Sequence, residues 1–274
     1  MADRSEILRE LGLLPLWRLR RAAPAKTPTR SSGAQAATVS AAETTATGSA
    51  PALQGIPEAS ADRLRHIATL GWPEFAADVA ACTACGLCRT RNKAVPGVGD
   101  VHAQWLFVGE APGAEEDAKG EPFVGQAGRL LDNMLAALGM NRAQNVYIAN
   151  VLKCRPPGNR TPTPLEAEAC RPYLDRQIAL IGPAIIVALG KSAATTLLNV
   201  DASIASLRGR LHRYQGVPLI VTYHPAYLLR NLPDKAKAWE DLCLARATMR
   251  RLQSENDPGA GLQTATVRPT LKPN

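Results

Sequence analysis

The feature that most constrains the fold is an alternation of short apolar runs with helical stretches between residues 105 and 252. The apolar runs cover residues 105–108, 146–149, 184–189 and 219–222, and the helical stretches cover 128–138, 165–181, 192–198 and 236–252. Apolar strands that alternate with helices are typical of a mainly parallel sheet covered on both faces. The sequence therefore predicts an α/β fold, a three-layer α/β/α sandwich around a mainly parallel four-stranded sheet.

Polar or glycine-rich residues follow each apolar run directly. These residues are Gly109 to Gly113, Asn150, Gly190-Lys191-Ser192 and His224-Pro225. In open parallel sheets, ligands bind beyond the carboxyl ends of the strands. We therefore expect the chemistry of this protein at these four positions.

The rest of the chain is simpler in composition. Residues 31–61 contain no Lys or Arg and consist largely of Ala, Ser, Thr, Gly and Pro, which predicts a disordered linker. Residues 1–30 are predicted to form a short helical segment, and residues 1–21 either pack on their own domain or dock to a protein partner. We expect the main domain over residues 62–253 and a flexible tail over 254–274.

The charge and the hydropathy of the chain limit which class of partner and which cellular compartment we expect for this protein. No apolar run approaches the roughly 20 residues that span a bilayer. The N-terminus carries Glu6 and Glu10 before its apolar core, the reverse of a signal peptide. We therefore expect a cytoplasmic monomer that does not contact membranes. A net charge of +8 and a pI of about 9.4 favour a polyanionic partner such as DNA.

Six cysteines in such a compartment indicate thiols or metal ligands rather than disulfides. Cys82 and Cys85 form a C-x2-C pair, Cys88 follows, and fifteen residues separate Cys154 from Cys170. Two such pairs fit either tetrahedral zinc or a [4Fe–4S] cluster. In a third arrangement, Cys82, Cys85 and Cys88 bind one cluster together, as in ferredoxin-like runs.

Four segments in this order resemble the family 4 uracil-DNA glycosylases. They are CTAC at 82–85, VGEAPGAEEDAKGEPFVGQAGRLLDNML at 108–135, YIANVLKCRPPGNRTP at 147–162 and HPAYLLR at 224–230. The resemblance covers roughly residues 75–252. It implies a monofunctional DNA-repair hydrolase that flips uracil out of DNA and hydrolyses its N-glycosidic bond with water. The product is an abasic site, which initiates base excision repair.

The resemblance also implies an iron–sulfur cofactor that staples the fold. In the family pattern, the ligands of a structural [4Fe–4S] cluster are Cys82, Cys85, Cys154 and Cys170. Cys88 has no place in that pattern.

Three residues are implied to form the uracil pocket. Phe123 stacks on the base, and Asn150 pairs with uracil O4 and N3–H, where cytosine has the opposite polarity. His224 hydrogen-bonds O2, where negative charge develops as the bond breaks. Taken alone, Phe123 could belong to the core, Asn150 could cap a turn and His224 could be a structural hydrogen-bonding group.

The segment after the first run is expected to complete the site. Glu110 is implied to position the attacking water, although a glutamate that caps local backbone donors is the alternative. The backbone of Gly109, Ala111 and Gly113 is expected to line the pocket.

DNA contacts are expected from the neighbouring loops. The apolar side chains of Leu228 and Leu229 resemble the wedge that fills the space left by a flipped base. Arg230 and Arg91 are expected to contact phosphates, and Lys191 opens a helix whose amides suit a phosphate. For each basic residue alone, a solvated surface position is the alternative.

Two other functions stay open. One is a uracil-DNA binding protein of the same superfamily, which captures the base through a histidine in an inserted Lys-Arg-Arg-Ile-His loop. Residues 151–157 contain no such insertion. The other is an iron–sulfur domain that acts on phosphate esters or accompanies a polymerase and has no glycosylase activity.

Overall fold

The computed structural model describes residues 58–255 of the chain. The segment 1–30, the predicted linker up to residue 57 and the tail beyond 255 lie outside the described residues, so those boundaries stay predictions. The first described helix, α2 (Glu58–Thr69), begins four residues before the predicted start of the main domain.

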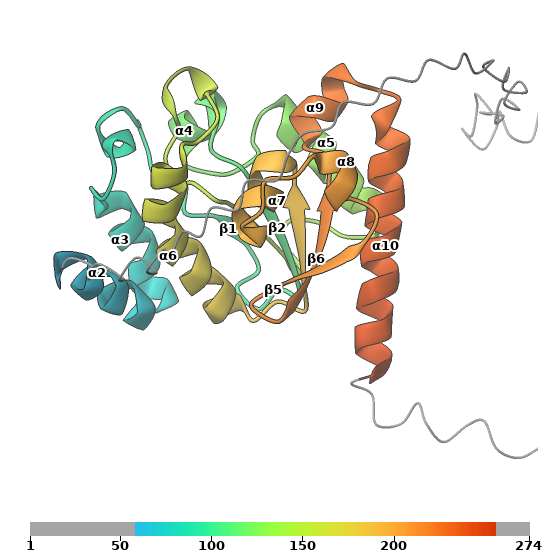
Figure 1. Ribbon diagram of the computed structural model, residues 1–274, viewed down its shortest axis with the longest axis horizontal. Helices are drawn as coiled ribbons and strands as arrows, with labels where there is room; N and C mark the ends of the chain where they lie inside the picture. The colour runs from blue at the N-terminus through green and yellow to red at the C-terminus, as the bar shows by residue number, and fades with distance from the viewer. Residues whose placement is uncertain (1–57, 256–274) are drawn as a thin grey trace, which may run out of the picture. The chain divides into compact units, whose positions relative to one another are not determined.

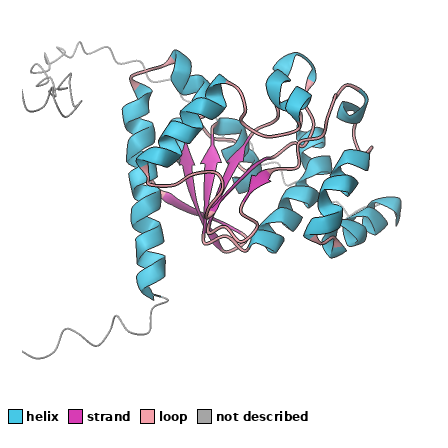
Figure 2. Ribbon diagram, turned by 180° about the vertical axis from the view of Figure 1, so that it is seen from behind, coloured by secondary structure: helices cyan, strands magenta, loops and turns pink. Residues whose placement is uncertain are grey.

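The sheet has six strands in the order β1-β3-β2-β4-β6-β5. The four predicted strands are its centre, and they run parallel: β3 (Val146–Asn150), β2 (Trp105–Gly109), β4 (Ile185–Leu189) and β6 (Val217–Thr222). Two antiparallel edge strands, β1 (Val98–Gly99) and β5 (Leu211–Tyr214), correct the predicted number of four. These two strands lack the continuous apolar run from which the other strands were predicted, because β1 has only two residues and β5 is partly exposed. Figure 2 shows the strands fanned between helices.

Helices cover both faces of the sheet, as predicted. Leu106 and Val108 of β2 point to the face packed by α6 (Pro164–Ile181) and α7 (Lys191–Leu198). Trp105 and Phe107 point to the opposite face, packed by α5 (Gln126–Ala137) and α10 (Asp234–Glu255). Side chains alternate between the faces of a strand, so a strand buried on both faces is apolar throughout.

Two N-terminal helices, α2 and α3 (Trp72–Ala81), form a satellite layer against α6 (Figure 1). Phe75 and Val79 of α3 share a buried cluster with Tyr173 of α6. Helix α3 ends at Ala81 with Cys82 as its C-cap, and the 3-10 helix η1 (Gly86–Arg89) follows. This packing brings the first cysteines beside α6.

The connections at the carboxyl ends of the strands diverge between β2 and β4, because the chain passes from β2 to β3 on one side and returns to β4 on the other. Such a switch point leaves a crevice for ligands. The short elements around it are α4 (Ala114–Lys119), η2 (Pro157–Asn159), α8 (Ile204–Leu207) and α9 (Pro225–Arg230). None of the helices within residues 58–255 is long and apolar enough to cross a membrane.

Candidate active site

A groove occupies the switch point at the carboxyl ends of the parallel strands. Glu110 enters it after β2, Gly190 to Ser192 after β4, and His224 after β6. Residues 161–164, which lead into α6, form its opposite wall. The groove therefore collects polar groups from segments far apart in the sequence.

Asn150, Phe123 and Gly109 meet beside this groove. Asn150 pairs with Gly109 in the register of β3 and β2. A Cβ atom on Gly109 would lie 2.4 Å from Asn150 Oδ1 and 2.6 Å from Phe123 Cζ, so glycine is required for this approach. Asn150 is 2% exposed, and its Oδ1 has no hydrogen-bond partner. A buried carbonyl without a partner is costly unless a ligand satisfies it.

Phe123 is held in a backbone conformation that is unusual for a large residue. Its φ is 55°, and Gly128 lies so close that a Cβ there would be 1.7 Å from Phe123 O. The Arg142 guanidinium donates to Pro122 O at 2.9 Å and also to Phe123 O. Strain that the surroundings enforce is typical of functional positions. Sequence reasoning missed Arg142, because nothing in its local sequence indicates contact with this loop.

His224 lies next to Phe123, with ring centroids 5.5 Å apart and planes at 29°. It caps α9, and its Nδ1 accepts a hydrogen bond from the Ala226 amide at 3.1 Å. An accepting Nδ1 leaves the proton of the neutral ring on Nε2. Burial, aided by the charge of Arg230, lowers the pKa of His224 to about 4. The imidazole is therefore neutral at pH 7 and has one N–H group to donate.

Glu110 is half-buried and lines the groove. Burial raises the pKa of its carboxyl group, and a hydrogen bond with Ser192 opposes the rise. Its backbone carbonyl accepts from the Leu152 amide at 3.1 Å, which fixes the main chain after β2. The main chain from which the carboxylate projects is thus fixed by a tertiary contact.

The loop after Glu110 is tied to the Phe123 loop by Glu116, which sequence reasoning did not select. Its carboxylate accepts from the amides of Gly113 at 3.1 Å, Val124 at 2.9 Å and Gly125 at 3.2 Å. The Gly113 N–H group, expected to line the pocket, is therefore engaged by a carboxylate. Ala111 is half-buried and packs against the core.

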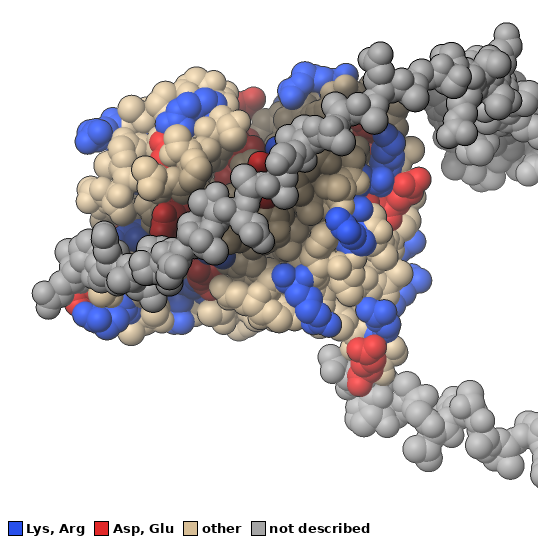
Figure 3. Space-filling view, in the orientation of Figure 1, with Lys and Arg blue, Asp and Glu red and all other residues tan. Residues whose placement is uncertain are grey.

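The predicted DNA-contact residues divide into exposed and buried positions. Leu229 is 41% exposed, and Arg230 and Lys191 are exposed as well. Leu228 is 1% exposed and packs with Tyr223 and Ala238, which corrects its prediction as a wedge. Helix α9 therefore directs Leu228 inward and Leu229 outward. Figure 3 shows Lys and Arg side chains along the upper edge of the molecule, at the carboxyl ends of the strands.

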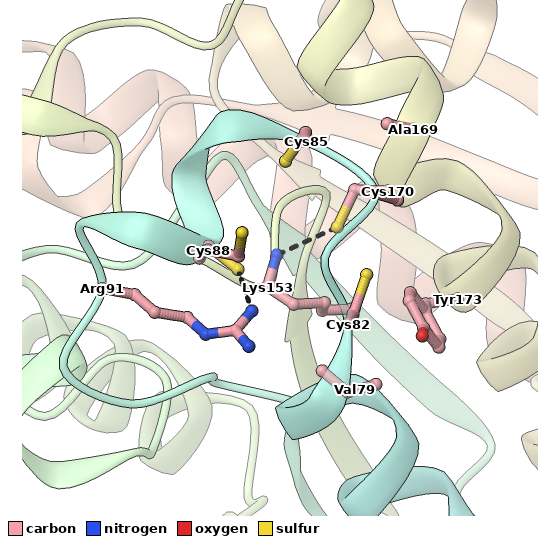
Figure 4. A pocket seen from close by; sticks show the side chains of 11 residues that line it. Val79, Cys82, Cys85, Cys88, Arg91, Lys153, Ala169, Cys170 and Tyr173 are labelled. Carbon is pink, nitrogen blue, oxygen red and sulfur yellow. Dashed lines mark hydrogen bonds between the residues drawn. The ribbon is translucent and has the colours of Figure 1, made fainter.

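The cysteines form a second site, separate from the groove. Cys82, Cys85, Cys88, Cys154 and Cys170 line one small cavity. Figure 4 shows the sulfur atoms of Cys82, Cys85 and Cys170 around the same space. Burial raises the pKa of the Cys154 thiol and raises that of Cys170 to about 12. No group of His, Cys, Asp or Glu side chains in the described part of the chain is arranged to hold a single metal ion.

Hydrogen-bond donors surround these sulfur atoms. Arg91 Nη1 donates to Cys154 Sγ at 2.9 Å, and the Lys153 amide donates to Cys170 Sγ at 3.3 Å. Arg63 lies 3.7 Å from Cys82 Sγ. Five cysteines around one cavity, three of them with an N–H donor aimed at the sulfur atom, fit a thiolate-ligated centre. Arg91 therefore lies at this cavity, and its expected contact with a phosphate stays a prediction.

Fold and site together define the class of this protein. The model of the uracil DNA glycosylase superfamily matches residues 96–243, more than half of the chain, and the chain belongs to that superfamily. It is 48% identical over 160 residues to the type-4 uracil-DNA glycosylase of Archaeoglobus fulgidus, which covers 56% of this chain and 80% of that relative. The type-4 uracil-DNA glycosylase of Thermotoga maritima is 44% identical over 174 residues, with 62% of this chain and 90% of the relative covered. The resemblance predicted from the four motifs is confirmed.

Proposed function

We propose that this protein is a monofunctional uracil-DNA glycosylase that hydrolyses the N-glycosidic bond of a flipped uracil and leaves an abasic site. The observation that carries the proposal is the buried, unpartnered Oδ1 of Asn150 beside Phe123, whose ring lies against that of His224. The names of the type-4 relatives support the same activity.

The Asn150 amide selects the base. Its Oδ1 accepts from uracil N3–H, and its Nδ2 donates to O4. Cytosine has a lone pair at N3 and an amino group at C4, so it leaves both partners unsatisfied. A site with buried polar groups rejects such an analogue strongly. Phe123 provides the apolar face on which the ring stacks.

His224 acts on the departing base. The Ala226 amide holds Nδ1, so Nε2–H is the donor that reaches uracil O2. A neutral donor at the position where negative charge develops stabilises the transition state without a proton transfer. The low pKa of His224 keeps the ring in this form at physiological pH.

Glu110 supplies the other half of the reaction. Its carboxylate lies in the groove that contains His224, beside Ser192. It orients the attacking water and offsets positive charge on the sugar. Water is the nucleophile, so no covalent enzyme–DNA adduct forms.

Exposed residues around the groove bind the DNA. Leu229 fills the space left by the extruded base, and Arg230 and Lys191 contact phosphates. The charge of +8 strengthens this binding electrostatically.

Cys82, Cys85, Cys154 and Cys170 hold a [4Fe–4S] cluster in the cysteine cavity. The cluster provides a structural cross-link between α3, the segment after β3, and α6. Cys88 lines the same cavity but lies outside the C-x2-C pair that the resemblance selects.

Base release from oligonucleotides tests the proposal. Purified protein is incubated with uracil-, hypoxanthine- and thymine-mismatch DNA, and free base and alkali-labile sites are measured. We expect release of uracil and none of thymine. A His224→Ala variant should lose about 10²- to 10³-fold in kcat, as for other charge-stabilising donors. A stable shifted band on a denaturing gel, or an adduct trapped by borohydride, would contradict the monofunctional mechanism.

A further inference from the structure

The side chain of Lys153 connects the two sites and has no part in the reaction described above. It is 1% exposed, and its ammonium donates to Asn150 O at 2.8 Å and to Gln177 Oε1 at 2.5 Å. Both acceptors are neutral. Within residues 58–255, no carboxylate lies within ion-pair distance of its Nζ.

A buried ammonium without a nearby anion is strongly unfavourable. The cysteine sulfur atoms of the neighbouring cavity become anionic when they bind a cluster. Lys153 directly precedes Cys154, lines the cysteine cavity, and donates its backbone amide to Cys170 Sγ (Figure 4). Four thiolates around an iron–sulfur core carry a net negative charge, which compensates the ammonium.

The other end of this contact is the base-reading residue. The carbonyl that accepts from Lys153 Nζ is that of Asn150 itself. The following residues are fixed too, because Val151 N donates to Gly109 O at 2.9 Å and Val95 N donates to Lys153 O at 2.8 Å. The ammonium therefore fixes the peptide plane from which the Asn150 side chain projects.

We infer that Lys153 is a positioning residue with two separable roles: its charge is the internal counter-ion of the cysteine-bound cluster, and its N–H donor orients Asn150 for uracil. The inference rests on the proposed function. It makes the occupancy of the cysteine cavity a determinant of base recognition.

Two variants separate the roles. Lys153→Met removes both charge and donor at similar length. Lys153→Gln removes the charge but keeps an N–H donor that can reach the Asn150 carbonyl. Lys235→Met, an exposed lysine on α10, is the matched control. The readouts are the rate at which an iron(II) chelator extracts iron from the purified holoprotein, and kcat and KM on uracil-DNA for the loaded fraction.

In both Lys153 variants, iron extraction should be about 10-fold faster than in wild type, because the cluster loses its counter-ion. Only Lys153→Met should lose about 10-fold in kcat, with KM within about 2-fold, because only it frees the Asn150 peptide. The control should match wild type in each measurement.

Wild-type iron retention in Lys153→Gln would overturn the counter-ion role, and an equal loss of kcat in both variants would overturn the donor role. If Lys153→Met does not fold, Lys153→Gln alone still tests both roles: fast iron loss supports the counter-ion role, and a 10-fold loss of kcat overturns the donor role. Wild-type protein without iron, or with iron but without uracil release, would refute the proposed function instead.

Discussion

The groove and the cysteine cavity differ in whether their polar atoms have hydrogen-bond partners within the protein. Beside the groove, Asn150 Oδ1 is buried without a partner, and in the groove His224 Nε2–H has none within the described residues. In the cavity, Cys154 and Cys170 accept hydrogen bonds from Arg91 and from the Lys153 amide. An unsatisfied group suits a ligand that arrives and leaves, whereas satisfied ligand atoms suit a permanent structural centre.

The largest expected effect comes from the cavity. Cys154→Ala should abolish iron binding and lower the melting temperature by on the order of 10 °C, because the free energy of cluster binding contributes to the free energy of folding. Iron content and thermal unfolding measure both. Cys88 lines the same cavity, but the Cys88→Ala variant should keep its iron. Equal iron loss in the two variants would refute the assignment of Cys82, Cys85, Cys154 and Cys170 as the four ligands.

The groove should respond in activity rather than in stability. Asn150→Asp removes the donor to uracil O4 and should lower kcat/KM on uracil-DNA by about 10²-fold or more. The melting temperature should stay close to that of wild type. Retained selectivity for uracil over cytosine in single-turnover assays would show that another group reads the base.

Adjacent leucines on α9 sharpen the contrast between buried and exposed positions. Leu228→Ala should lower the free energy of unfolding by about 2–4 kcal/mol, because it opens a cavity in the core. Leu229→Ala should leave stability unchanged and raise KM for duplex DNA by about 10-fold. Denaturant titration and steady-state kinetics distinguish them, and the reverse pattern would contradict the assignment of the wedge.

Arg142 tests whether the strained Phe123 loop matters for recognition. Arg142→Met removes the donors to Pro122 O and Phe123 O. We expect KM for uracil-DNA to rise by roughly 5-fold with a smaller change in kcat, because the aromatic face loses its preferred position. An unchanged KM would show that Gly128 and the local packing suffice.

The smallest effect is a pH dependence of stability. His224 has a pKa of about 4 in the folded protein, below the usual histidine value of 6.5. The unfolded chain therefore binds the proton first, and stability that is present above about pH 6.5 is lost as the pH falls towards 4. Unfolding free energies of wild type and His224→Asn across this window check the sign. Parallel curves would contradict the burial of the ring.

Much of the architecture is determined by the sequence. Strands buried on both faces must be apolar throughout, so the four central strands were predicted to within two residues at their ends. Their carboxyl ends share one edge, so Glu110, Asn150, Lys191 and His224 could be placed there from chain order alone. The edge strands escaped prediction because short or exposed segments carry no such pattern.

Only the tertiary structure decided which polar atoms have hydrogen-bond partners and which side chains are buried. Arg91 belongs to the cysteine cavity, and Leu228 to the core, because helix packing fixes where each side chain points. Three residues could be identified only from the structure, because their hydrogen-bond partners lie on other elements: Arg142, Glu116 and Lys153. Sequence patterns report burial and periodicity, whereas hydrogen-bond partners depend on distances between segments that the chain brings together only on folding.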